Sequence, residues 1–162
     1  MENINDLLDE NRKNWFKLLT IVGNNRLKEK KIINYLKKED WQVYDVEEKI
    51  FELSDKIPPE KIKLRIGSEI KRWVKSLGDK SIFINTSILY SEELGKVGPY
   101  GQFKYHMRGN KEGIIFIQAR LRGNLAIYST PDRLDYNETE LEEVVYADLD
   151  KIAIPGDNND SN

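Results

Sequence analysis

The chain has 162 residues, of which 39% are hydrophobic and 33% charged, and its formal net charge is −2. This size and composition predict one globular domain that is large enough to bury a core. The absence of cysteine excludes disulfide and thiolate chemistry, and the single histidine, His106, excludes a multi-histidine metal site. No apolar run approaches the ~20 residues that span a membrane, and no signal peptide follows Met1. We therefore expect a cytoplasmic protein with no membrane partner.

The spacing of apolar residues predicts helices and strands that alternate along the chain. Helical spacing covers 3–15, 26–39, 47–55 and a longer segment that starts at Pro58-Pro59 and stops at Gly78. Short apolar runs predict strands at 16–22, 41–46, 81–85, 113–119 and 124–128. A helical turn is expected at 88–94, a loop with a short helix at 96–109, a helix at 138–145 and a short strand at 146–149. The link at 120–123 is short enough to predict a hairpin or tight turn.

Strands that alternate with helices predict an α/β domain of three layers with a mainly parallel central sheet. We assign residues 1–154 to this single domain. The remaining segment, 155–162, contains no large apolar residue, so we expect it to be a disordered polar tail.

Gly23 follows the first apolar strand and precedes a basic helix, which is where phosphate-binding proteins place their glycine-rich loop. The Walker A form requires Gly-x-x-x-x-Gly-Lys-Ser/Thr. Counted from Gly23, its last three positions are filled by Lys28, Glu29 and Lys30. The candidate residues of a degenerate nucleotide- or phosphate-binding loop are Gly23, Asn24, Asn25, Arg26 and Lys28.

The strand at 81–85 ends in Asn85, where a P-loop enzyme needs an acid to help hold Mg²⁺. Walker-type nucleotide hydrolysis is therefore not expected. Two interpretations stay open: a P-loop-like domain that has lost hydrolysis, and an unrelated α/β fold with an ordinary glycine turn.

Charge is distributed unevenly along the chain. Six basic residues and one acid lie between Lys61 and Lys75, and the same numbers lie between Lys96 and Arg122. From Asp132 to Asp160 there are ten acids and two bases. The basic segments predict a surface that meets nucleic acid or an acidic partner, or simply a solvated face.

The segment from Gly98 to Lys111 interleaves aromatic and basic residues, as in proteins that bind single-stranded nucleic acid. The alternative is that Tyr100, Phe103 and Met107 form the buried stripe of a short helix. His106 has no evident partner acid, so it is not assigned as a general base. The candidate residues for binding nucleic acid or a partner are Tyr100, Lys104, Tyr105, Arg108 and Lys111, joined by Arg120 and Arg122 where the 109–113 turn folds back.

Three stretches together resemble a small P-loop-containing accessory protein of BREX-type phage-defence systems. They are Leu19-Thr20-Ile21-Val22-Gly23, then Ile82-Phe83-Ile84-Asn85 with Ile88-Leu89-Tyr90, and Ala126-Ile127-Tyr128 before Thr130-Pro131. The resemblance follows the order of elements over most of 16–136. It implies a P-loop-like fold and an accessory role in a multiprotein complex that recognises or modifies DNA. The family is expected to have an intact phosphate loop, and this chain departs from it at Lys28, Glu29 and Lys30.

Two classes of function follow from these observations. The first is a non-catalytic accessory or assembly module that binds protein, DNA or RNA through basic and aromatic surfaces. The second is an enzyme acting on nucleic acid or nucleotide, with an active site formed by residues far apart in the sequence. No catalytic residue, metal ligand or cofactor is predicted, and the first class is favoured.

Overall fold

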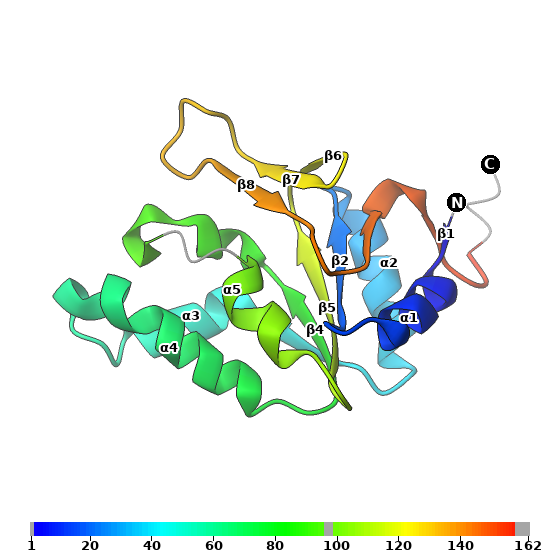
Figure 1. Ribbon diagram of the computed structural model, residues 1–162, viewed down its shortest axis with the longest axis horizontal. Helices are drawn as coiled ribbons and strands as arrows, with labels where there is room; N and C mark the ends of the chain where they lie inside the picture. The colour runs from blue at the N-terminus through cyan, green and yellow to red at the C-terminus, as the bar shows by residue number, and fades with distance from the viewer. Residues whose placement is uncertain (1, 96–98, 158–162) are drawn as a thin grey trace.

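The computed structural model describes residues 2–95 and 99–157, with the side chains of 99 and 100 excepted. A central sheet of five parallel strands organises the domain, in the order β3-β4-β5-β2-β9 (Figure 1). Its strands are β2 (Leu18–Val22), β3 (Gln42–Asp45), β4 (Lys80–Ile84), β5 (Glu112–Ile117) and β9 (Tyr146–Asp148). The α/β class and the mainly parallel central sheet are thus confirmed.

Helices cover both faces of this sheet (Figure 1). One core lies under α1 (Ile4–Lys13) and α2 (Arg26–Lys37). The other lies under α3 (Val46–Ser54), α4 (Ile62–Lys75) and α5 (Pro99–Phe103). Neighbouring residues of one strand point to opposite faces, so Leu18 joins the second core while Leu19 joins the first. Short 3₁₀ turns complete the connections: η1 (Pro59–Lys61), η2 (Thr86–Tyr90), η3 (Glu92–Leu94), η4 (Lys104–His106) and η5 (Leu149–Lys151).

A three-stranded antiparallel sheet projects beyond the carboxyl ends of the central strands (Figure 1). It consists of β6 (Arg120–Arg122), β7 (Leu125–Tyr128) and β8 (Asn137–Glu140). The prediction that the 120–123 link is the turn between the strands at 113–119 and 124–128 is wrong. Residues 120–122 form β6, which pairs with β7 in a hairpin, and β5 belongs to the other sheet. The ring of Tyr128 stacks on the buried ring of Tyr90, with centroids 4.3 Å apart, and so fastens this sheet to the domain.

The helix predicted at 138–145 is wrong, because residues Asn137–Glu140 form β8. The edge of β7 is open, and β8 hydrogen-bonds to it in antiparallel register. Half-buried and exposed residues alternate along β8, as expected of a strand with one face on the protein.

The two ends of the domain lie side by side. The two-residue strands β1 (Glu2–Asn3) and β10 (Ile152–Ala153) pair in parallel, a contact that the sequence did not predict. Of the expected polar tail, residues 155–157 are described and 158–162 lie outside the described residues. Asp157 contacts α2, with its Oδ2 3.6 Å from Nζ of Lys31. Among the described residues, no helix is long and apolar enough to cross a membrane.

Candidate nucleic-acid interface

The central sheet has two edges at which loops meet: the carboxyl edge, where its strands end, and the amino edge, where they begin. In open α/β sheets, ligands usually bind at the carboxyl edge, where neighbouring connections diverge. The predicted phosphate loop lies there, between β2 and α2. The basic segment around His106 lies at the amino edge.

The connection between β2 and α2 has only three residues, 23–25. The side chain of Asn25 caps α2, because its Oδ1 accepts a hydrogen bond from the backbone N–H of Lys28 at 3.1 Å. The N–H of Gly23 donates to the carbonyl of Ile117 at 3.0 Å. A Cβ added at Gly23 would lie 2.6 Å from Cβ of Leu149. Because Gly23 has no side chain, Leu149 of η5 can pack directly against its backbone.

The other predicted phosphate-binding residues also bind the protein itself. Nζ of the buried Lys28 donates to the carbonyl of Asp150 at 3.1 Å. The guanidinium of Arg26 donates to Oε1 of Gln118 at 3.0 Å. The side-chain amide of Asn24 donates to the carbonyl of Ala119 at 3.3 Å.

A crevice of about 470 Å³ opens beside this connection at the carboxyl edge. The side chains of Asp148 and Asp150 line it together with Arg120, so its negative charges oppose a bound phosphate. Asn85, at the end of β4, turns its side chain elsewhere and donates to Oδ2 of Asp45 at 2.8 Å. The polar side chains of the predicted phosphate loop thus form hydrogen bonds within the protein, which leaves few of them available to a nucleotide.

The amino edge brings together two basic segments that are far apart in the sequence. The helix α4 buries Ile66, Ile70 and Val74, which recur every four residues, and exposes its basic side chains, including Lys71 and Lys75. Nζ of Lys111, in the turn before β5, donates to the carbonyl of Lys75 at the end of α4, at 2.7 Å. This hydrogen bond joins the end of α4 to the turn that follows η4.

His106 lies near several cations at this edge. Burial lowers the pKa of His106 below its ordinary value, and four cations lower it further: Lys75, Lys71, Arg108 and Lys111. We call these four cations the basic surface. Within residues 2–95 and 99–157, none of them forms a salt bridge with a carboxylate. The basic surface therefore presents uncompensated positive charge to solvent.

The described part of this segment, 99–111, has buried and exposed side chains. Phe103 and Met107 are fully buried, which confirms an inward stripe. Tyr105 and Arg108 face outward, and Tyr105 keeps 51% of its surface exposed. The side chain of Tyr100 lies outside the described residues.

Lys104, which we predicted to bind a ligand, has a mostly buried side chain. Only 12% of its side chain is exposed, and its Nζ lies 3.8 Å from Oε2 of Glu143. The same ammonium group lies over the rings of Phe16 and Tyr105, 5.2 Å from each centroid. Lys104 therefore holds the two aromatic rings together, and its ammonium group is less accessible to a ligand.

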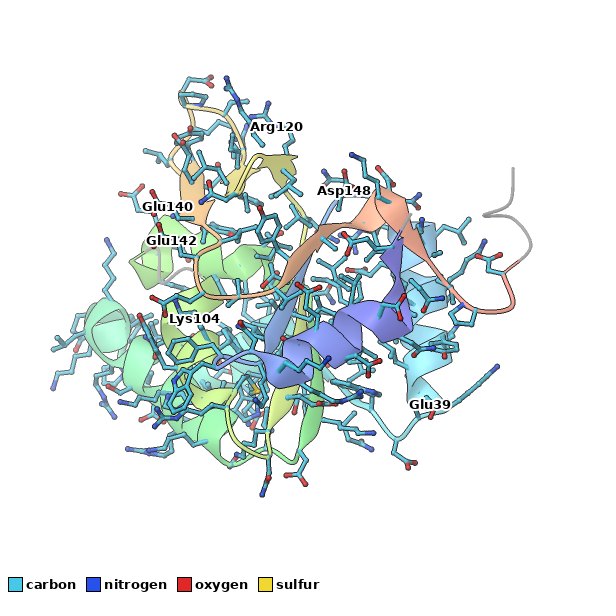
Figure 2. All side chains as sticks on the ribbon, turned by 45° about the vertical axis from the view of Figure 1, so that its right-hand side comes forward. Glu39, Lys104, Arg120, Glu140, Glu142 and Asp148 are labelled. Carbon is cyan, nitrogen blue, oxygen red and sulfur yellow. The ribbon has the colours of Figure 1, made fainter. Side chains whose placement is uncertain are left out.

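The expected approach of Arg120 and Arg122 to this segment is wrong. Both belong to β6, beyond the carboxyl end of β5, whereas Arg108 and Lys111 precede its amino end. The six residues of β5 separate the two groups by roughly 20 Å. Figure 2 shows the separation, with Arg120 near the top of the molecule and Lys104 far below it.

Two residues that the sequence interpretation did not assign, Lys71 and Lys75, take the place of these arginines. A signal was present, since the two lysines are four residues apart on a predicted basic helix and hence on one helix face. What the sequence could not supply was the contact between this helix and the 108–111 turn.

Comparisons with known proteins add no assignment: no family model matches the chain, and neither curated proteins nor solved structures gave a match. Within the described part of the chain, no group of three or more His, Cys, Asp or Glu side chains could hold a metal ion.

Proposed function

We propose that the protein is a non-catalytic binding module that holds nucleic acid on its basic surface. The observation that carries this proposal is the gathering of four cations without carboxylate partners around one half-buried histidine. Nucleic-acid binding draws its affinity mainly from such contacts between cations and phosphates. The basic surface comes from two elements that a hydrogen bond joins, so the segments that carry its charges are already side by side before a ligand arrives.

The proposal is tested by fluorescence anisotropy with labelled DNA and RNA at several salt concentrations. The informative variant changes Lys71, Lys75 and Arg108 to alanine and keeps Lys111, because Lys111 also supports α4. On a single strand, each phosphate contact contributes about −0.7 to the slope of log K against log salt. Loss of three contacts should therefore flatten the slope by about 2 and weaken binding at low salt at least about 10-fold.

Arg120 and Arg122 provide the matched control. Both are exposed, both belonged to the sequence-based expectation, and both lie at the other end of β5. Their double alanine variant should keep the affinity and salt slope of the wild type. Equal losses in the two variants would show non-specific attraction, and an absence of binding in the wild type would overturn the proposal.

The finer description of the fold belongs to this proposal as well. A P-loop-like ancestry is supported by the strand–glycine–helix order of β2 and α2 and by the central place of β2 between β5 and β9. The resemblance noted in the sequence extends the proposal to an accessory role in a BREX-type defence complex. In a strain that carries such a complex, deletion of the chain should reduce protection against phage. The wild-type chain should restore protection, and the triple alanine variant should not.

A further inference from the structure

Exposed aromatic rings lie beside the basic surface. Trp15 and Tyr105 keep 69% and 51% of their surface exposed, although both are large side chains that folding usually buries. Trp15 is next in the chain to Phe16, whose ring meets the ring of Tyr105 edge-on with centroids 5.4 Å apart. Tyr105 in turn is the neighbour of His106, which lies among the four cations.

Contacts within the chain hold Phe16 and Tyr105 next to each other. The ammonium group of Lys104 binds the rings of Phe16 and Tyr105 together. The backbone of Lys17 is tied to β5 and to the residue after η4, since its carbonyl accepts from the N–H of Gly113 at 2.8 Å and its N–H donates to the carbonyl of Met107. The segment at 15–17 therefore cannot move freely relative to η4, and a base stacked there would meet a preformed platform.

A hollow of about 670 Å³ continues from this platform along α4. Tyr105 and His106 line one side, while Lys63, Leu64 and Lys71 of α4 line the other. Leu64 is 83% exposed and adds an apolar contact. From Lys63 to Lys71 the hollow follows α4 for about 12 Å, and Lys75 lies one further turn along.

We infer that the ligand of the basic surface is single-stranded nucleic acid, with unpaired bases stacked on Tyr105 and Trp15 and the backbone following α4. The inference rests on the proposed function. A ring can stack only on a base whose face is open, and a duplex keeps those faces covered along its length. Cations placed next to exposed rings match the two parts of a single strand, its phosphates and its bases.

The experiment compares three fluorescein-labelled probes of equal length by anisotropy: dT20, a 20-mer of abasic sites, and a 20-base-pair duplex. The abasic strand keeps the phosphates and lacks the bases. We expect dT20 to bind at least about 10-fold more tightly than either of the other probes, given the usual strength of base–aromatic stacking.

Variants of Tyr105 assign the preference to the ring. Tyr105→Ala should remove a large part of the preference for dT20 over the abasic strand and leave the affinity for the abasic strand unchanged. Tyr105→Phe keeps the ring and should keep the preference for dT20. Unchanged abasic binding also serves as the control that the basic surface of the alanine variant is intact.

Trp15 gives an independent optical signal, because it is far more exposed than Trp41, which is 3% exposed. Binding of dT20 should quench tryptophan fluorescence, and Trp15→Phe should remove most of that quenching. A quench that persists in this variant would contradict stacking on Trp15.

The outcomes separate the inference from the proposed function. Equal affinity for dT20 and the abasic strand, with both lost in the Lys71/Lys75/Arg108 variant, would overturn the inference and leave the proposed function standing. Tighter binding of the duplex would do the same and would point to α4 lying in a groove. Absence of binding to all three probes would overturn both.

Discussion

The two edges of the central sheet use similar polar residues in opposite ways. At the carboxyl edge, Asn24, Asn25, Arg26 and Lys28 each donate or accept a hydrogen bond within the chain. At the amino edge, the cations of the basic surface have no carboxylate partner among the described residues, and they lower the pKa of His106. Of these four cations, Lys111 also donates to the carbonyl of Lys75, whereas Lys71, Lys75 and Arg108 are exposed and can meet a ligand.

This difference shows that the usual position of a ligand site in an α/β sheet does not by itself locate the site. The carboxyl edge has the expected glycine turn and helix start, but its hydrogen bonds are internal and Asp148 and Asp150 line the crevice. The amino edge has no motif, yet it carries the uncompensated charge. Local electrostatics is therefore the better guide in this chain.

The largest effect should come from filling the space at Gly23. In Gly23→Ala the new Cβ would lie 2.6 Å from Cβ of Leu149, so η5 must shift. We expect the free energy of unfolding to fall by about 1–3 kcal/mol, as for other overpacked sites. Urea denaturation measures it, with Gly78→Ala as the control, since a Cβ at Gly78 meets no atom within 4 Å. Nucleic-acid affinity should not change in either variant.

Removal of the α2 cap should cost less. Asn25→Ala deletes the oxygen that accepts from the N–H of Lys28, and we expect a loss of about 1 kcal/mol in the free energy of unfolding. Asn25→Asp should retain most of the stability, because aspartate caps equally well.

The same residue tests whether the carboxyl edge binds a nucleotide. If the cap and the internal hydrogen bonds fully occupy this loop, millimolar ATP with Mg²⁺ should leave the Tm of the wild type unchanged. A rise in Tm with ATP concentration that disappears in Asn25→Ala would contradict the contrast between the edges.

His106 should report ligand binding at the amino edge through its pKa. Burial and the four cations hold the pKa of His106 low, so a polyanion on the basic surface should raise this pKa toward its ordinary value near 6.5. We expect this rise on addition of a saturating oligonucleotide. His106 is the only histidine, so its imidazole signal in an NMR titration needs no assignment. By linkage, binding should tighten as the pH falls from 7 to 6.

A fall in pH should strengthen nucleic-acid binding but lower the stability of the free protein, and both effects come from protonation of His106. The folded protein disfavours protonated His106, so the free energy of unfolding of the free protein should decrease as the pH drops below about 6.5. Replacement of Lys71, Lys75 and Arg108 by alanine should raise the pKa of His106 in the free protein and weaken both pH effects. An unchanged pKa in that variant would show that the cations do not act on His106.

The smallest effect should follow from Lys104→Met. Its side chain is 12% exposed and already contacts Glu143 and two rings, so we expect less than about 3-fold loss of nucleic-acid affinity. Lys71→Ala, at an exposed position, should weaken binding more. The reverse order would place the ligand on Lys104 and shift the interface away from α4.

The sequence predicted the fold better than it predicted the site. Apolar runs predicted β2, β4 and β5 because burial on both faces leaves a strong signal, as in Ile114 to Ile117. β8 was missed because its acidic residues carry no such signal and its structure depends on pairing with β7. The two-residue strands β1 and β10 are too short to show a periodicity.

The site depended on contacts between distant segments, which spacing cannot reveal. Arg108 and Lys111 were identified, but Arg120 was grouped with them although it lies across β5. Lys71 and Lys75 were noted as part of a basic helix and were not linked to the 108–111 turn. Trp15 was assigned to a helix face, whereas the helix ends at Lys13 and leaves the ring exposed.

The pairing of β1 with β10 has a consequence for circular permutants and for fusion proteins made from this domain. Because Glu2 lies opposite Ile152, the ends of the domain leave from one corner, away from α4 and α5 (Figure 1). A short linker could join them, so circular permutants with new ends in the exposed Gly123–Asn124 turn should retain the fold. Any domain attached at either end would also extend from that corner, and the amino edge would stay accessible.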